Sequence, residues 1–204
     1  MKTLIASNNA HKHQELREIF ASLQALIEVV IPRAIGITID PDETADTYAG
    51  NALLKARDFA QALNATASPQ TLWVIADDSG LEVDALHGAP GILSSRYHKA
   101  APAGDGCAAL LNELASVPDH QRGARFRCAI VLIAPDGSEY MFEGVCEGRI
   151  GHEKRGQGGF GFDPVFIPDG DTRTLAEYAP DEKHRISHRG VAARKAVAFL
   201  AAHK

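Results

Sequence analysis

The chain has 204 residues, of which 45% are hydrophobic and 23% are charged, and its formal net charge is −5. A chain of this length can bury a sizeable core without disulfides, and it fits one large domain or two small lobes that share a core. Its negative charge argues against a nucleic-acid-binding protein with a broad basic face. The charge still allows an anionic small molecule to be held by a few clustered lysines and arginines.

The three cysteines, Cys107, Cys128 and Cys146, are odd in number and widely spaced. They lack the spacing of a zinc site, so they indicate reduced core thiols and a cytoplasmic protein. The amino-terminal segment has one lysine and a five-residue apolar run, which is too short for a signal peptide or a membrane span. We therefore expect neither a membrane nor a nucleic acid as a partner.

The first third of the chain alternates between strand and helix patterns. Asn8 or Asn9 can cap a first helix, and Thr47 can cap a second. The apolar stripes of these helices are Leu16, Ile19, Phe20 and Leu23, and then Leu53, Ala56, Ala60 and Leu63. Short apolar runs predict strands at 2–7, 28–32 and 71–77, and the last is apolar throughout, as in the centre of a sheet.

The rest of the chain predicts a long hairpin between two helices. Asp105 can begin the first of these helices, and Ser187 can cap the second. The hairpin strands flank the turn sequence PDGS. The last helix is expected to bury the stripe Val191, Arg194, Val197 and Leu200. Predicted strands here are 124–134, 139–150 and 164–168. The whole pattern predicts one domain over residues 1–204, with an α/β fold, a mixed central sheet flanked by helices, and two lobes with a ligand cleft between them.

A glycine-rich loop, GQGGFGFD, precedes the last predicted strand. Gly156, Gly158 and Gly161 match G-x-G-x-x-G, but a strand-like segment follows where a dinucleotide site requires a helix. The loop is either a flexible turn or a backbone that approaches a flat ligand closely, with Phe160 or Phe162 stacked on it.

Two adjacent acids, Asp77 and Asp78, follow the third predicted strand. Neighbouring carboxylates repel each other and lose hydration at such a position, and a divalent cation relieves that cost. Mg²⁺ prefers one or two carboxylates together with water and phosphate oxygens. The acids of segment 40–46 fit either a solvated loop or further ligands. Ser79 stands beside two acids, which oppose a nucleophilic role.

Four basic side chains lie near the starts of predicted helices, where free N–H groups also favour anions: Lys12, Lys183, His188 and Arg189. A fifth, Lys55, follows Asn51 by one helical turn, so these two side chains share a polar helix face. Each cluster alone is typical of a solvated surface. Together with the acid pair and the glycine-aromatic loop, they describe a site for a magnesium–nucleoside triphosphate.

Four motifs occur in the order found in the inosine/xanthosine triphosphate pyrophosphatase family, which the whole chain resembles. They are SNNAHK, ADDSGLEVDALHGAPG followed by SRY, GFGFDPVF, and SHRG. The resemblance implies hydrolysis of ITP, dITP and XTP to the monophosphate and pyrophosphate with Mg²⁺. It also implies a homodimer of two-lobed subunits that bind the nucleotide in the cleft.

The resemblance also implies roles for particular residues. Asp78 is the implied catalytic proton acceptor, and Glu43 and Asp78 are the implied metal ligands. The implied substrate-binding residues are Ser7, Asn8, Asn9, Ala10, His11, Lys12, Lys55, Ser79, Phe160, Gly161, Phe162, Asp163, Lys183, His188 and Arg189. Within this set, the resemblance implies that residues 7–12 form a triphosphate-binding segment and that residues 160–163 form a base-binding run. A backbone N–H in 160–163 or near His188 would donate to the 6-oxo group of the base and so reject adenine.

Two of the chain's departures from the family pattern remove a possible contact, whereas a third, SSRY for the commoner SARY, is a small change. Phe162 stands where a tyrosine is common, so a contact from a tyrosine hydroxyl is absent. Gly50 stands where an acid is common, so no carboxylate acts from there. Two other hypotheses stay open from the sequence: a pyrophosphatase for modified pyrimidine nucleotides, and a nucleotide sensor without turnover.

Overall fold

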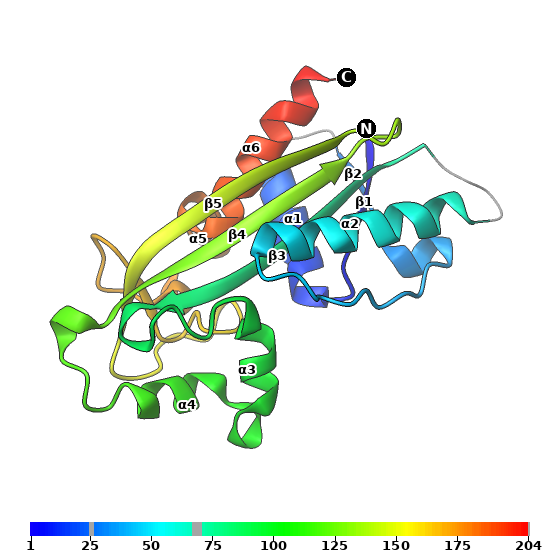
Figure 1. Cartoon of the computed structure of the whole chain (residues 1–204). Coiled ribbons are helices and arrows are strands. Elements are labelled where there is room, and N and C mark those ends of the chain that lie inside the picture. The colour runs from blue at the N-terminus through cyan, green and yellow to red at the C-terminus, as the bar shows by residue number, and fades with distance from the viewer. Residues whose placement is uncertain (25–26, 67–70, 204) are drawn as a thin grey trace. The chain divides into compact units, whose positions relative to one another are not determined.

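The computed structural model describes residues 1–24, 27–66 and 71–203. Within these residues, a six-stranded sheet has the order β2-β1-β3-β4-β5-β6 (Figure 1). β1 pairs in parallel with β2 and β3, whereas β5 and β6 are antiparallel, so the sheet is mixed as predicted. The strands are β1 (Lys2–Ile5), β2 (Glu28–Val30), β3 (Trp73–Val83), β4 (Gly123–Ile133), β5 (Glu139–Ile150) and β6 (Phe166–Pro168).

Predicted caps begin three of the helices. The side chain of Asn9 accepts hydrogen bonds from the first turn of α1, Thr47 does so in α2, and Asp105 does so in α4. These caps satisfy N–H groups that have no partner inside the helix. The α-helices of the described residues are α1 (Ala10–Ser22), α2 (Tyr48–Asn64), α3 (Ser94–Ala100), α4 (Gly106–Glu113), α5 (Pro180–Ile186) and α6 (His188–Ala202).

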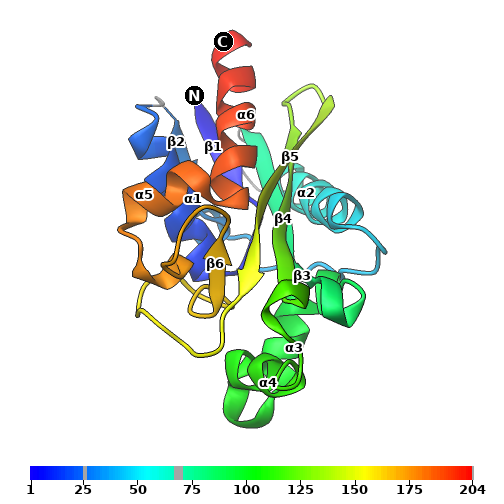
Figure 2. The same ribbon diagram turned by 90° about the vertical axis from the view of Figure 1, so that its left-hand side faces the viewer.

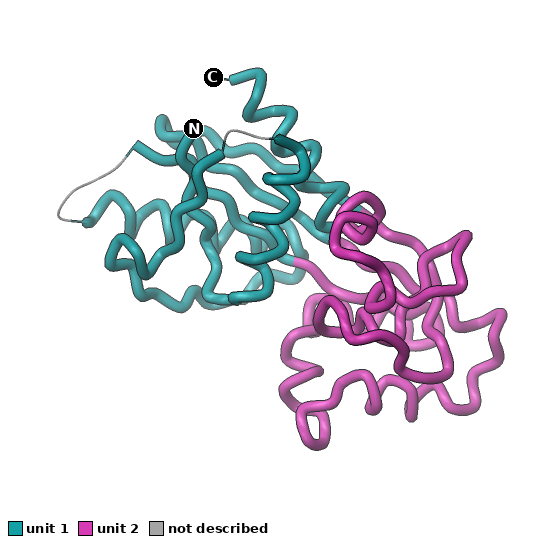
Figure 3. Tube along the Cα trace, turned by 180° about the vertical axis from the view of Figure 1, so that it is seen from behind, with its two compact units in different colours: residues 1–78, 128–144, 189–204 teal, residues 79–127, 145–188 magenta. Residues whose placement is uncertain are grey.

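The chain divides into two compact units (Figure 3). Unit 1 comprises residues 1–78, 128–144 and 189–204, and unit 2 comprises residues 79–127 and 145–188. Strands β3, β4 and β5 each contribute residues to both units. Each unit has a hydrophobic core of its own.

The core of unit 1 lies on both faces of its strands. Figure 2 shows α2 on one side of these strands and α1 and α6 on the other. Alternate residues of a strand point to opposite faces, and β3 follows this rule. Val74 and Ala76 pack in the cluster that contains α2 residues, whereas Ile75 packs in the cluster that contains α1 and α6 residues.

The core of unit 2 packs the parts of β3, β4 and β5 that belong to this unit against α4 and the glycine-rich loop. Leu81, Phe126 and Ile150 pack there with Leu110 of α4 and Phe162 of the loop. The loop therefore has one side chain anchored in the hydrophobic interior of this unit.

One sequence prediction about an element was wrong, and another was only partly right. β3 does not end at Asp77 but continues through the acid pair to Val83. In the predicted stripe of α6, Leu200 is buried, but Val191, Arg194 and Val197 are half-buried, and the other buried hydrophobic residues of the helix are Ala192, Ala193 and Ala196. Alanines let a helix pack close to the sheet, and the prediction had favoured larger side chains. No helix of the described residues has the length and apolarity needed to cross a membrane.

Candidate active site

The predicted triphosphate segment, residues 7–12, forms a tight connection from β1 to α1. The hydroxyl of Ser7 accepts a hydrogen bond from the Asn9 N–H (3.1 Å), and the Asn9 side chain accepts from the N–H groups of His11 and Lys12 (2.9 and 3.3 Å). The cap thus occupies two of the donors that the helix end would otherwise offer to an anion. Positive charge in this segment comes from the Lys12 ammonium.

Other residues of the segment are also placed. The Asn8 side chain donates to the carbonyl of Ile39 (2.8 Å). This hydrogen bond ties the segment to the start of the acidic loop, residues 40–46. Asn8, Asn9, Ala10 and His11 are exposed, whereas Ser7 is buried.

Asp77 lies on the α1/α6 face of β3 in a closed network of charges. Its Oδ2 accepts from Nε and Nη2 of Arg189 (3.1 and 2.9 Å) and lies 3.2 Å from Nζ of Lys12. Nη1 of Arg189 donates to Glu15 (2.5 Å), which is itself buried. Burial alone would raise the pKa of Asp77, but the charges of Lys12 and Arg189 outweigh burial and hold the pKa well below its usual range.

This network bears on the predicted role of Arg189. Its guanidinium is buried between two carboxylates, so its charge is already neutralised inside unit 1. A direct contact of Arg189 with the nucleotide stays a prediction. Sequence reasoning missed Glu15, although its i, i+3 spacing from Lys12 places the two side chains on one helix face.

Asp78 lies on the opposite face of the same strand, toward α2. Nζ of Lys55 lies 3.2 Å from Oδ1 of Asp78 and 2.6 Å from Oε1 of Glu43. The Asn51 side chain donates to Oδ2 of Asp78 (3.3 Å) and accepts from the Ala45 N–H (2.9 Å). Burial raises the pKa of Asp78, and the opposing charge of Lys55 does not fully offset it. Asn51 therefore links Asp78 to the acidic loop.

The i, i+4 spacing of Asn51 and Lys55 predicted that both side chains share the polar face of α2. The contact of Asn51 with Asp78 was not predicted. The strand extension also changes the interpretation of the acid pair: Asp77 and Asp78 point to opposite faces and do not form one carboxylate cluster.

The donor set around Asp78 fits Mg²⁺. Glu43 and Asp78 converge on one positive charge, the Lys55 ammonium, so their carboxylates already share a cation-sized position. Within the described residues, no group of three His, Cys, Asp or Glu side chains is arranged to hold a metal. Two carboxylates completed by water and phosphate oxygens are the arrangement that Mg²⁺ commonly adopts.

In unit 2, the predicted base-binding run is held by Asp163. Its Oδ2 accepts from the Phe160 N–H (2.7 Å) and from Nζ of Lys183 (2.7 Å). Gly159 has φ +67°, and a Cβ there would lie 2.1 Å from Asp163 Oδ2, so the position requires glycine. Lys183 Nζ lies 5.5 Å from the centroid of the Phe160 ring. The structure thus brings two predicted residues, Phe160 and Lys183, together around the carboxylate of a third, Asp163.

The two phenylalanines of the run differ in exposure. Phe162 is 2% exposed and belongs to the core of unit 2, whereas Phe160 is half-buried. Of the two rings, only that of Phe160 is exposed enough to stack on a base. Phe162 could contact a ligand through its backbone groups. His188 is also buried and stacks on Phe126, with ring centroids 4.7 Å apart and planes 9° apart. Ser79 is half-buried on β3.

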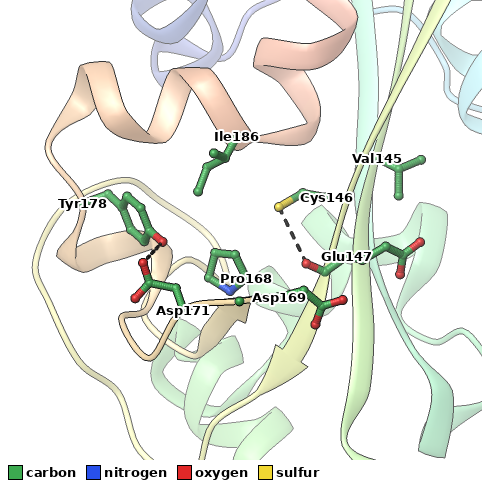
Figure 4. A pocket seen from close by; sticks show the side chains of 9 residues that line it. Val145, Cys146, Glu147, Pro168, Asp169, Asp171, Tyr178 and Ile186 are labelled. Atoms are coloured by element: carbon green, nitrogen blue, oxygen red, sulfur yellow. Dashed lines mark hydrogen bonds between the residues drawn. The ribbon is translucent and has the colours of Figure 1, made fainter.

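A separate pocket of about 490 Å³ lies in unit 2 (Figure 4). Its lining includes Glu147, Asp169 and Asp171, and Asp171 accepts a hydrogen bond from the Tyr178 hydroxyl (2.6 Å). None of the predicted site residues lines it. Three carboxylates oppose a polyanionic triphosphate, so this pocket is not the candidate substrate site.

The chain is similar to known proteins over nearly its whole length. The chain is 45% identical to a dITP/XTP pyrophosphatase of Opitutus terrae, covering 93% of each chain. It is also 45% identical to one of Porphyromonas gingivalis, covering 98% of this chain and 97% of the other. A solved HAM1 protein from Coxiella burnetii has a TM-score of 0.81 and 36% identity, covering 98% of each chain. The Ham1 family model matches residues 3–199, and the chain belongs to the Ham1 family.

Proposed function

We propose that the protein hydrolyses the non-standard purine nucleoside triphosphates ITP, dITP and XTP to the monophosphate and pyrophosphate, and so removes them from the nucleotide pool. The similar proteins named dITP/XTP pyrophosphatase support this substrate class. The structural observation that carries the proposal is the Asp78 carboxylate, buried and with a raised pKa, beside Glu43 and Lys55. Such a carboxylate suits a general base near neutral pH better than an ordinary aspartate.

The chain supplies a base and its positioning groups. Asp78 accepts the proton of the water that attacks the α-phosphorus, and the P–O bond to the leaving pyrophosphate breaks. Asn51 and Lys55 hold the two oxygens of Asp78, and this orients the carboxylate for proton transfer. Lys12 provides positive charge at the segment assigned to the phosphates.

Mg²⁺ would be held by Glu43 and Asp78, and when bound it offsets phosphate charge and lowers the pKa of a water ligand. We also propose that the enzyme requires Mg²⁺, forms a homodimer and is located in the cytoplasm. The location is supported by the three cysteines, which are free and buried. The homodimer rests on resemblance to the family, and light scattering at micromolar concentration checks it.

The deciding experiment measures pyrophosphate release by the purified chain from ITP, dITP, XTP, ATP, GTP and a methylated pyrimidine triphosphate. Each substrate is tested with Mg²⁺ and with excess EDTA. We expect kcat/KM for ITP and XTP to exceed that for ATP by at least ~10²-fold, or about 2.7 kcal/mol, and EDTA to abolish turnover. Equal hydrolysis of all purine triphosphates would replace the proposal with a general nucleotide pyrophosphatase, and binding without turnover would indicate a sensor.

A further inference from the structure

One peptide group in the base-binding run is held from the interior of unit 2. The Cys107 thiol donates to the carbonyl of Gly161, with Sγ and O 3.2 Å apart. Gly161 has φ +64°, a backbone conformation that side chains other than glycine rarely adopt. Cys107 is 3% exposed and comes from α4, so the carbonyl of the loop is tied to a buried point of a helix.

The hydrogen bond from the Cys107 thiol also fixes the direction of the Phe162 N–H, which belongs to the same peptide group as the Gly161 carbonyl. The C=O and N–H of a trans peptide group point in opposite directions. With the Gly161 carbonyl directed at Cys107, the N–H of Phe162 points away from that thiol. Among residues 1–24, 27–66 and 71–203, this N–H has no hydrogen-bond partner. Within the described residues it is therefore an unpaired donor of the loop, directed away from Cys107.

A second contact holds the Phe162 side of the same peptide. The ring of His98 on α3 packs against the ring of Phe162, with centroids 4.4 Å apart. His98 Nδ1 accepts from the N–H of Gly106 (3.2 Å), and a Cβ at Gly106 would lie 2.6 Å from that nitrogen. Gly106 directly precedes Cys107, so the two contacts start from adjacent residues at the beginning of α4.

We propose that Cys107 and His98 are positioning residues that set base choice by presenting the Phe162 N–H to the 6-oxo edge of the purine. The inference rests on the proposed function and deepens it. Hypoxanthine and xanthine offer an oxygen acceptor at position 6, whereas adenine offers an amine that also donates. A rotated peptide would present the Gly161 carbonyl instead, and that group accepts from the adenine amine.

The thiol is suited to this task because burial raises the pKa of Cys107 to about 11. It stays protonated at neutral pH and keeps its donor. Guanine shares the 6-oxo group, so loss of the thiol changes discrimination against ATP and leaves the ratio of ITP to GTP unchanged. A change in the ITP/ATP ratio alone therefore distinguishes recognition of the 6-oxo group from general damage to the site.

The test measures kcat/KM of the full chain for ITP, GTP and ATP in the wild type, Cys107→Ala and Cys107→Ser. We expect Cys107→Ala to lower the ITP/ATP ratio about fivefold to tenfold, the scale of one net hydrogen bond, mainly through KM. The serine variant retains a donor and should recover part of the ratio. The matched control is Cys146→Ala, which removes the same atom from a buried thiol of the same core whose hydrogen bond goes to the Glu147 carbonyl and not to Gly161. His98→Phe keeps a ring against Phe162 but loses the acceptor, and it should shift the ratio in the same direction.

An unchanged ITP/ATP ratio in Cys107→Ala and His98→Phe would overturn the inference, and so would an equal shift in Cys146→Ala. A parallel fall in the ITP/GTP ratio would also overturn it, because the 6-oxo group would then not be the feature read. Absence of ITP hydrolysis in the wild type is a separate result that rejects the proposed function itself.

Discussion

The two faces of β3 in unit 1 carry the same side chain in opposite electrostatic environments. Asp77 faces α1 and α6, where two cations hold its pKa below the usual range. Asp78 faces α2, where burial dominates and raises its pKa. Adjacent residues of one strand thus acquire different chemistry because the pleat sends them into different charge clusters. We infer that the network of Asp77, Arg189 and Glu15 chiefly maintains the structure and that the Asp78 face supplies the base for the reaction.

The largest effect is expected on stability at the Asp77 face. Asp77→Asn removes one partner of a buried ion pair and leaves the charges of Arg189 and Lys12 beside a neutral amide. The free energy of unfolding should fall by about 3–5 kcal/mol. Urea denaturation measures it, with Asp58→Asn, an exposed aspartate of α2, as the control. A loss below about 1 kcal/mol would contradict a structural role for Asp77.

A large effect on turnover is expected at the Asp78 face. Asp78→Asn should lower kcat by at least ~10²-fold, because the amide neither accepts the proton of water nor provides an anionic metal ligand. The fold should survive, since the amide retains an oxygen acceptor for the Lys55 ammonium. Steady-state pyrophosphate release and thermal unfolding are measured on one preparation. Near-normal turnover would show that another group activates the water.

A smaller effect on stability is expected at Glu15, the carboxylate of α1 that pairs with Arg189. Glu15→Ala removes the second carboxylate from Arg189 but leaves the pair with Asp77. We expect a loss of about 1–3 kcal/mol in stability, with part of it recovered in Glu15→Gln. Glu18→Ala, on the same helix, is the control. A loss of turnover in Glu15→Ala without any loss of stability would place the α1/α6 face in the reaction and weaken the division between the two faces.

Local sequence signals predicted much of the fold. Caps such as Asn9 and Thr47 depend on residues within one helical turn, and the hairpin at 135–138 depends on a short turn sequence. The mixed sheet followed from the alternation of strands and helices. The end of β3 was predicted wrongly because polar residues after an apolar run resemble a strand end. Here the strand continues because charged partners on both faces compensate the two acids.

The missed residues share a different cause. Glu15 and Asn51 have ordinary helical spacing, and their roles come from partners distant in sequence: Arg189 is 174 residues from Glu15, and Asp78 is 27 residues from Asn51. The Cys107 contact to Gly161 spans 54 residues. Local periodicity carries no information about such pairs. The resemblance to a family supplied Glu43 and Asp78 as metal ligands, but it did not show that Lys55 joins them.

The smallest expected effect is a difference between the two faces in how the free energy of unfolding depends on pH, measured without added metal. The pKa of Asp77 is lowered from 3.8 by Lys12 and Arg189, so the unfolded chain binds its proton at a higher pH than the folded chain does. The stability from Asp77 is therefore complete above pH ~4 and is lost as pH falls through the folded-state pKa. Consequently, the advantage of the wild type over Asp77→Asn should shrink only below pH ~4.

The sign reverses at Asp78, where burial raises the pKa against the opposing charge of Lys55. The folded chain now binds the proton at a higher pH than the unfolded chain, so wild-type stability falls as pH rises from 3.8 through the raised pKa. The stability of Asp78→Asn relative to the wild type should therefore increase across this interval and then level off. Urea midpoints from pH 3 to 7 in EDTA measure both differences. If the two variants diverge from the wild type over the same interval and with the same sign, the faces are not electrostatically distinct, and the assignment of the reaction to Asp78 loses its physical basis.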